Sequence, residues 1–123
     1  MKKLNYVIVF VSDMQRSIRF YRDALGLPLK FDSPEWTEFA TEGVTLALHQ
    51  AEGGQPGAAP KRASAGSCQP GVGVENLDEF HQAMLSQQVR CIQAPKLQDF
   101  GVRLAIYRDP DGLPISVAEM GKK

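Results

Sequence analysis

The chain has 123 residues, of which 43% are hydrophobic and 23% are charged, so its composition favours one globular domain and excludes a disordered or fibrous protein. Its 14 basic and 14 acidic side chains cancel, and it lacks the basic cluster that a nucleic-acid partner requires. The first apolar run is too short for a signal peptide or a membrane span, and Cys68 and Cys91 lack a C-x-x-C spacing, so we expect a cytoplasmic protein with free thiols and no membrane partner.

The first half of the chain predicts the order strand, helix and three strands. Residues 4–11 are rich in β-branched and aromatic side chains, which favours a buried strand. Either Ser12 or Asp13 can cap a helix over residues 14–24, and Gly26 and Pro28 stop it. Three β-leaning runs separated by turn residues follow, at residues 29–31, 36–40 and 44–49.

A stretch rich in Gly, Ala and Pro, residues 52–67, separates the two halves. It has almost no large apolar residue, so it cannot pack a core. Its composition favours a tether between the halves over a lid above a binding site, and both readings stay open. We therefore divide one domain, residues 1–123, into a first module at 1–51, a connector at 52–68 and a second module at 69–121.

The second half repeats the order of the first. A strand at 70–74 leads to the cap Asn76 and a helix at 77–88, whose Phe80, Met84 and Leu85 are expected to face the core. Further strands are predicted at 89–93, 102–107 and 113–118. The Asp-Pro-Asp-Gly sequence at 109–112 is typical of a tight hairpin turn, so we assign it to structure rather than to catalysis.

The two halves align with each other. Residues 11–14 fall on residues 74–77 at a shift of about 63 positions, which also places Tyr21 on Met84. One helix covers only one face of a four-stranded sheet, so two such modules must curve around a shared interior. The predicted fold class is α+β, with two βαβββ modules forming a cupped mixed sheet around a cavity.

Strand alternation predicts which side chains face that cavity. On the first strand, the helix side is assigned to Val7, Val9 and Val11, and the inward side to Tyr6, Ile8 and Phe10. The other inward positions are Thr45, Ala47 and His49 in the first module, and Gln69, Gly71, Gly73, Pro114, Ser116 and Ala118 in the second. On the strand at 102–107, either Leu104 and Ile106 or Tyr107 face inward.

The segment at residues 11–27, VSDMQRSIRFYRDALGL, resembles the first module of the vicinal oxygen chelate superfamily of glyoxalases, bleomycin resistance proteins and extradiol dioxygenases. The second half resembles the same superfamily at 73–77, GVENL, and at 107–112, YRDPDG. Together these segments span nearly the whole chain. The resemblance implies a glyoxalase-like fold of paired modules, usually in a homodimer, with a divalent metal held where the modules meet.

The metal-ligand positions that the resemblance implies hold unsuitable residues. Members that use a metal place a His on the first strand of one or both modules and a carboxylate on the last strand of each. Carried over by position, these ligands fall on Tyr6, Gln69, Ala47 and Ser116. Ala47 has no donor atom and the others are poor neutral donors, so we expect neither a metal nor another cofactor.

The remaining polar and aromatic candidates each have two readings. His49 either joins Tyr6 or Gln69 in a weak metal site of altered geometry or is a cavity histidine bonded to a neighbour, and one imidazole favours the second reading. His81 is expected on a helix surface. Glu35 and Glu38 lie on a strand that is either near the cavity mouth or a solvated sheet edge, and the edge is favoured. Trp36 is either a stacking wall for a planar ligand or a core residue.

The predicted ligand-binding residues are Tyr6, Ile8, Phe10, Trp36, Ala47, His49, Gln69 and Ser116. The sequence favours a metal-free small-molecule-binding protein that sequesters an antibiotic or a metabolite, similar to the bleomycin resistance branch. The alternative is a lyase, isomerase or dioxygenase of the same superfamily that uses a rearranged metal site, or Tyr6 and His49 as acid and base. A third reading is a structural partner whose cavity is vestigial.

Overall fold

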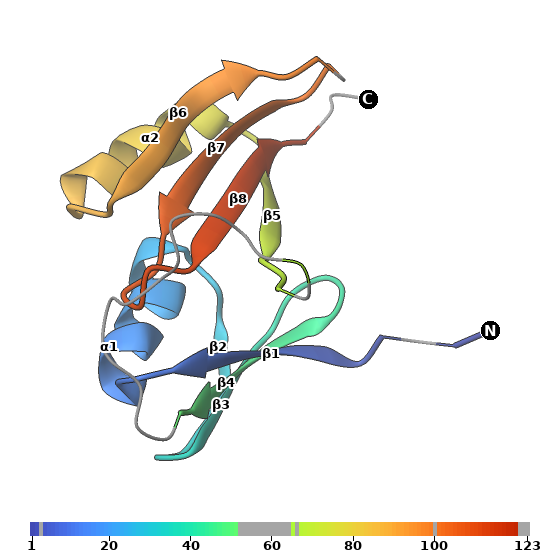
Figure 1. Cartoon of the computed structure of the whole chain (residues 1–123), viewed down its shortest axis with the longest axis vertical. Coiled ribbons are helices and arrows are strands. Elements are labelled where there is room, and N and C mark those ends of the chain that lie inside the picture. Colours follow the sequence, from blue (N-terminus) through green and yellow to red (C-terminus); the bar gives the residue numbers. More distant parts are fainter. Residues whose placement is uncertain (3, 52–64, 66, 100, 121–123) are drawn as a thin grey trace. The chain divides into compact units, whose positions relative to one another are not determined.

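The structure is a computed structural model that describes residues 1–2, 4–51, 65, 67–99 and 101–120. The chain forms two compact units, Met1–Ala58 and Ala59–Lys123, and each contains one four-stranded sheet (Figure 1). Most of the predicted connector at 52–68 lies outside the described residues. The two predicted roles of this connector, a tether or a lid, therefore both stay predictions. Within the described ranges, no helix is long and apolar enough to cross a membrane.

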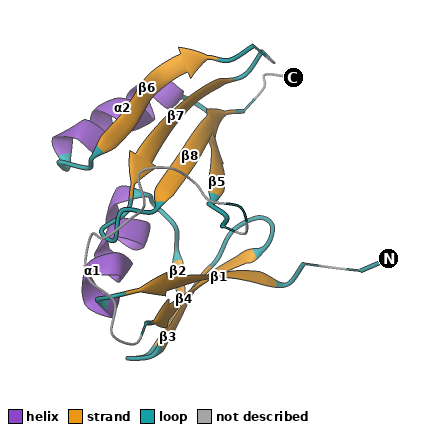
Figure 2. Cartoon of the chain, in the orientation of Figure 1, coloured by secondary structure: helices purple, strands orange, loops and turns teal. Residues whose placement is uncertain are grey.

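The first unit follows the predicted order of strand, helix and three strands (Figure 2). Its elements are β1 (Tyr6–Val11), α1 (Met14–Arg19), η1 (Phe20–Ala24), β2 (Leu29–Asp32), β3 (Trp36–Phe39) and β4 (Thr45–Gln50). The strand order is β1-β4-β3-β2, with β1 parallel to β4 and the other neighbours antiparallel. The predicted helix has the expected extent, but its second half, η1, is a π-helical turn.

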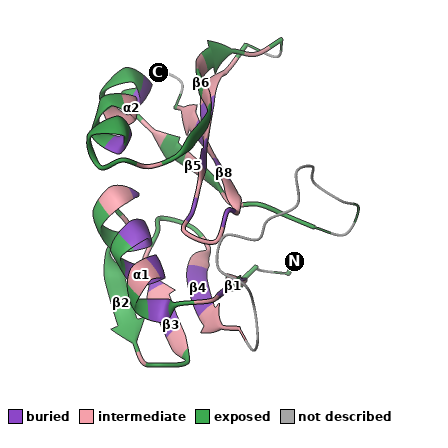
Figure 3. Cartoon of the chain, turned by 60° about the vertical axis from the view of Figure 1, so that its left-hand side comes forward, coloured by how far each residue is buried: buried purple, intermediate pink, exposed green. Residues whose placement is uncertain are grey.

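The helical segment of the first unit lies on one face of its sheet, and the buried residues gather between them (Figure 3). The Tyr21 ring of η1 contacts the Phe39 ring of β3, with 6.0 Å between the centroids. Val11 on β1 is fully buried, whereas Tyr6 and Phe10 are 51% and 64% exposed. The predicted alternation of β1 is therefore confirmed, and two aromatic side chains lie on the face away from the helix.

The second unit contains β5 (Gly71–Val74), α2 (Leu77–Ser86), β6 (Cys91–Leu97), β7 (Arg103–Arg108) and β8 (Pro114–Glu119), in the strand order β5-β8-β7-β6. Its fully buried apolar residues are Leu77, Met84, Ala105, Tyr107, Ile115 and Val117. Phe80 of α2 contacts the Tyr107 ring, with 6.0 Å between the centroids. Tyr107 therefore faces the helix, and alternation turns Leu104 and Ile106 to the opposite face, which settles the orientation that the sequence left open.

Three predictions for the second unit are wrong in detail. The helix ends at Ser86, because Gln88 has a φ of +60° and the Val89 amide donates back to the helix. Strand β6 consequently begins at Cys91, and it runs on to Leu97 because an edge strand tolerates a proline within it. Leu85, which was expected in the core, is 45% exposed. Its neighbour Met84 takes the core position at that turn of α2.

The turn between β7 and β8 is a structural element, as its composition predicts. The Asp109 carboxylate is buried and accepts hydrogen bonds from the backbone amides of Asp111 and Leu113, at 2.9 and 2.8 Å. Gly112 has a φ of +89°, a conformation that side chains disfavour. The Asp109 side chain therefore stabilises the turn through these hydrogen bonds.

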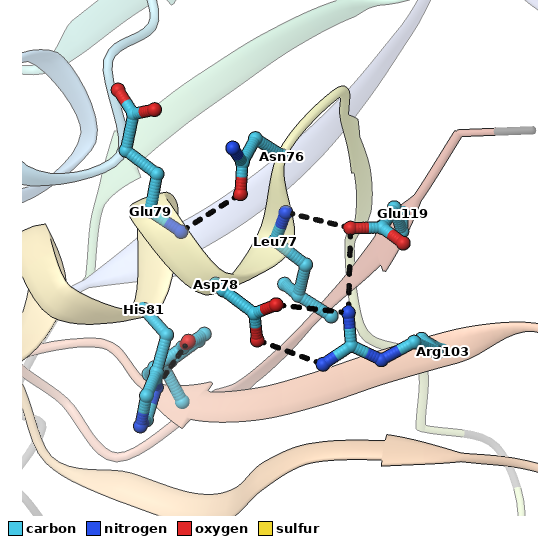
Figure 4. A network of polar contacts seen from close by, with 8 residues as sticks. Asn76, Leu77, Asp78, Glu79, His81, Arg103 and Glu119 are labelled. Atoms are coloured by element: carbon cyan, nitrogen blue, oxygen red, sulfur yellow. Dashed lines mark hydrogen bonds and ion pairs between the residues drawn. The ribbon is translucent and has the colours of Figure 1, made fainter. Parts of the chain in front are cut away.

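The internal repeat extends to the hydrogen bonds that start each helix. Asp13 caps α1 by accepting from the Arg16 amide, and Asn76 caps α2 by accepting from the Glu79 amide. The last strand of each unit supplies a second cap. Gln50 at the end of β4 accepts from the Met14 amide at 3.1 Å, and Glu119 at the end of β8 accepts from the Leu77 amide at 3.0 Å (Figure 4).

Candidate functional site

The candidate site is the open face of the first sheet, the face away from α1. The register between parallel β1 and β4 places Tyr6 beside Thr45, Ile8 beside Ala47 and Phe10 beside His49. On the other side of β4, antiparallel β3 places Trp36 beside His49 and Glu38 beside Ala47. Every residue predicted for this face in the first module therefore lies on it, because side chains paired across neighbouring strands share a face.

Four rings on this face form a continuous aromatic row, which consists of Tyr6, Trp36, His49 and Phe10. The Trp36 ring is perpendicular to Tyr6, with centroids 5.8 Å apart, and nearly perpendicular to His49, at 5.9 Å. His49 and Phe10 are 5.4 Å apart and tilted by 45°. These are favourable aromatic geometries, yet Tyr6 and Phe10 stay more than half exposed, which is unusual for large aromatic side chains.

Ala47 lies at the centre of this face and is fully buried. Trp36 starts on β3, next to His49, but its ring contacts Tyr6, which lies on β1 on the far side of β4. The two side chains therefore meet over β4, and Ala47 is the residue of β4 that lies between Thr45 and His49 on this face. A larger residue at position 47 would compete with the indole for that space.

The family-type metal ligands do not fit the residues present. At the position of one carboxylate ligand, Ala47 offers no donor atom and is fully buried. In the second unit, the Ser116 hydroxyl is 3.5 Å from the Pro70 carbonyl oxygen to which it donates. Among the described residues, no three His, Cys, Asp or Glu side chains lie close enough to share a metal ion. This donor set lacks the imidazole and carboxylate groups that hold a divalent metal tightly.

His49 has a defined tautomer. Its Nδ1 atom is 2.8 Å from the Gln50 carbonyl oxygen. A carbonyl oxygen only accepts, so Nδ1 must carry the hydrogen, and Nε2 is the acceptor nitrogen of the neutral ring. His49 thus matches the reading of a histidine bonded to a neighbour, and it contributes one acceptor to the aromatic row.

Glu38 lies on this face beside Ala47, whereas the reading that the sequence favoured placed it on a solvated sheet edge. The Trp36 Nε1–H donates to Glu38 Oε2 at 2.8 Å, and the Lys30 ammonium lies 3.7 Å from Glu38 Oε1. The side chain of Glu38 is only 29% exposed, so it is not part of a fully solvated edge. A strand alternates with a period of two residues, so the spacing Trp36 to Glu38 was the signal that could have placed both on one face.

The predicted residues of the second module lie in the second unit. Gln69 precedes β5 and is exposed, and Ser116 lies on β8 beside Gly71. Their joint placement with Tyr6 and His49 in one cavity stays a prediction. A Cβ atom on Gly73 would lie 3.0 Å from the Met120 side chain, so the second open face is closely packed there without a side chain.

His81 is not a simple surface residue, contrary to expectation. It is half-buried, and its Nδ1 atom is 2.9 Å from the hydroxyl oxygen of the buried Tyr107. Burial, and secondarily the charge of a Cys91 thiolate, raises the pKa of Tyr107 to about 12. The phenol therefore stays protonated at neutral pH, and this hydrogen bond ties α2 to β7.

Comparisons with known proteins agree on one superfamily. A sequence profile described as "Glyoxalase/Bleomycin resistance protein/Dioxygenase superfamily" matches residues 3–117. The chain is 30% identical over 118 residues to the phenazine antibiotic resistance protein EhpR of Enterobacter agglomerans, covering 94% of this chain and 91% of that protein.

Two solved structures illustrate the likeness in fold. A protein of unknown function from Agrobacterium tumefaciens is 27% identical, with a TM-score of 0.79 and coverage of 98% of this chain and 95% of that one. A glyoxalase/dioxygenase from Nostoc punctiforme is 20% identical, with a TM-score of 0.83 and coverage of 98% and 92%. The predicted α+β fold class is thereby confirmed.

Proposed function

Because the chain belongs to the Glyoxalase/Bleomycin resistance protein/Dioxygenase superfamily, we propose that it binds a small planar aromatic molecule on the aromatic row, without a metal ion. The observation that supports this proposal is the aromatic row itself, which consists of Tyr6, Trp36, His49 and Phe10. Stacked or edge-on ring pairs contribute about 0.5–1.5 kcal/mol each beyond the burial of apolar area. A flat ligand that covers the exposed rings therefore gains from several contacts at once.

The relative with the phenazine resistance name supports this class of ligand. A phenazine is a planar molecule of three fused rings, and the relative aligns with nearly the whole of this chain. The formal net charge of this chain is zero, which favours a neutral ligand over a strongly cationic drug. The function that follows is sequestration, in which an antibiotic or metabolite is held without being altered.

Catalysis by Tyr6 and His49 is the second candidate, favoured by the acceptor Nε2 of His49. The acid and the base must both lie within hydrogen-bond reach of one substrate. Tyr6 pairs with Thr45, and His49 is four residues farther along β4, which is about 13 Å of strand. The Trp36 ring contacts both side chains and occupies part of the intervening space. This spacing favours binding over proton transfer.

A homodimer is also part of the proposal, since the resemblance to the superfamily implies one. An exposed aromatic face, with Tyr6 and Phe10 more than half exposed, is the kind of surface that a second copy or a ligand covers. Light scattering after size exclusion, with and without ligand, distinguishes a dimer of about twice 13.5 kDa from a monomer.

Trp36 is the one tryptophan of the sequence, so its fluorescence reports on the proposed site alone. We expect phenazine, which is neutral, to quench this emission with a saturable one-site isotherm, and calorimetry to give the same affinity. Tyr6→Leu should weaken binding about fivefold, because one ring contact is lost. Phe80→Leu, an aromatic change on α2 of the second unit, serves as the matched control and should bind as the original chain does. An absence of heat and of saturable quenching would overturn the proposal.

A further inference from the structure

We infer that Glu38 is a positioning residue, which holds the Trp36 indole across β4 in the orientation that the ligand requires. The inference about ligand affinity rests on the proposed function, whereas the inference about the indole does not. The main evidence is the hydrogen bond of 2.8 Å that Trp36 Nε1–H donates to Glu38 Oε2. A bond from an indole to an ionised carboxylate is stronger than one between neutral groups.

The indole needs such a partner. Its Nε1–H is a donor without an acceptor function, and a half-buried donor without a partner is costly. The indole also contacts Tyr6, which lies on β1, although Trp36 itself lies on β3, so the two side chains lean toward each other over β4. Glu38, two residues along β3, anchors the nitrogen end of the ring, and the contact with Tyr6 defines another edge.

The carboxylate itself is held mainly by the indole. Its other partner is Lys30, whose ammonium is 52% exposed in its side chain and 3.7 Å from Glu38 Oε1. A salt bridge of this length and exposure contributes little. Lys30 also donates to Thr45 at 3.5 Å, so its charge is shared between two acceptors. Removing Lys30 should therefore leave the indole where it is, which makes Lys30→Met a matched control on the same carboxylate.

The single tryptophan makes the test direct, because a ¹H–¹⁵N spectrum contains one indole Nε1–H signal. In Glu38→Ala this signal should move upfield, and its exchange with water should accelerate by about tenfold, as expected for a lost bond to a charged group. Glu38→Gln keeps an acceptor oxygen and should restore both values most of the way. Lys30→Met should match the original chain. An unchanged signal and exchange rate in Glu38→Ala would overturn the inference.

The affinity for neutral phenazine, measured by calorimetry, tests the second half of the inference. Binding should weaken by about three- to tenfold in Glu38→Ala and return most of the way in Glu38→Gln, because the amide oxygen of Gln still accepts the indole N–H. Equal loss in both variants would refute positioning and indicate direct contact of the charge with the ligand. If the original chain binds no phenazine while the indole signal responds as described, the proposed function fails and the role of Glu38 in orienting Trp36 stands.

Discussion

The two units share one scaffold and differ in what their open faces display. Both run βαβββ, both start the helix with an Asp or Asn cap, and both add a second cap from the last strand. The positions that hold Ile8 and Phe10 in the first unit hold Gly71 and Gly73 in the second. The roles that build the scaffold thus recur, although the residues differ. The open face has large side chains in the first unit and glycines at the same positions in the second, so we propose that the ligand binds on the first unit.

The second caps differ in charge, and this difference has structural consequences. Gln50 is neutral and uses both ends of its amide, accepting from the Met14 amide and donating to the Ser12 carbonyl at 2.7 Å. Glu119 is an acid, and Arg103 lies 3.5 Å from its carboxylate (Figure 4). Arg103 also forms a two-bond contact with Asp78 in the first turn of α2. The first unit thus uses a neutral amide, which we call the amide clip of Gln50. The second unit uses the charged network of Asp78, Arg103 and Glu119 at the same place.

The largest expected difference between the units concerns their matched core residues, Tyr21 and Met84. Both are fully buried. Tyr21→Ala should lower the free energy of unfolding by about 3–5 kcal/mol, because Tyr21 also contacts the rings of Phe20 and Phe39. Met84→Ala should lower it by roughly 2–4 kcal/mol, since a flexible thioether leaves a site that collapses more readily. Urea denaturation measures both values, and a greater loss for Met84→Ala would contradict this ranking.

Much of this arrangement could be predicted from the sequence, because local rules decide it. Alternation placed Tyr6, Ile8 and Phe10 on one face, and the capping residues at 12–13 and 75–76 marked both helix starts. The repeat then fixed the order of the remaining strands. These features depend on residues that are neighbours in the chain or are separated by one element.

Features that depend on side-chain packing were missed. The reach of Trp36 to Tyr6 follows from a rotamer that tertiary contacts select, so alternation alone left its stacking role open. The same holds for the bond of Glu38 to that indole and of His81 to Tyr107. Whether Gln69 and Ser116 line one cavity with Tyr6 and His49 depends on how the two modules are placed relative to each other. Their shared cavity therefore stays a prediction.

The second caps give the next largest effect. Glu119→Ala removes the acceptor of the half-buried Leu77 amide hydrogen bond and a partner of Arg103, and it should cost roughly 1–2 kcal/mol of stability. Gln50→Ala should cost about 1 kcal/mol, because the bonds it loses involve a neutral side chain. Glu119→Gln, which copies the first unit, should fall between the original chain and Glu119→Ala. If Glu119→Gln is as stable as the original chain in urea, the charge of this cap contributes nothing.

Tyr107 adds a difference that appears at high pH. Its pKa is raised from about 10 to about 12 by burial, so this phenol favours folding fully below pH 10. That contribution is lost as the pH rises from 10 toward 12, because the unfolded chain releases the proton first. Tyr107→Phe should cost about 1 kcal/mol at pH 7, through loss of the bond to His81, and should flatten the decline above pH 10. An equally steep decline in Tyr107→Phe would assign it to other groups.

The smallest expected effect is a loss of stability at low pH, which the charged network of the second unit should show and the neutral Gln50 of the first unit should not. The hydrogen bond from Arg103, and secondarily the charge of its guanidinium, lowers the pKa of the Asp78 carboxyl. A lowered pKa in the folded state means that this pair favours folding above the pKa of the unfolded chain and loses that effect as the pH falls through the folded value. The Asp78 side chain is 71% exposed and that of Arg103 is 34% exposed, so the effect should be small and should shrink in high salt. The difference in Tm between the original chain and Asp78→Asn should therefore be positive at pH 7 and vanish toward pH 2. Asp13→Asn in the first unit keeps the cap, and no arginine among the described residues makes a two-bond contact with Asp13. The part of the pH dependence that is unique to Asp78→Asn therefore belongs to the pair with Arg103. If the Tm difference at pH 2 equals that at pH 7, Asp78 stabilises the fold through uncharged contacts and not through its ion pair with Arg103.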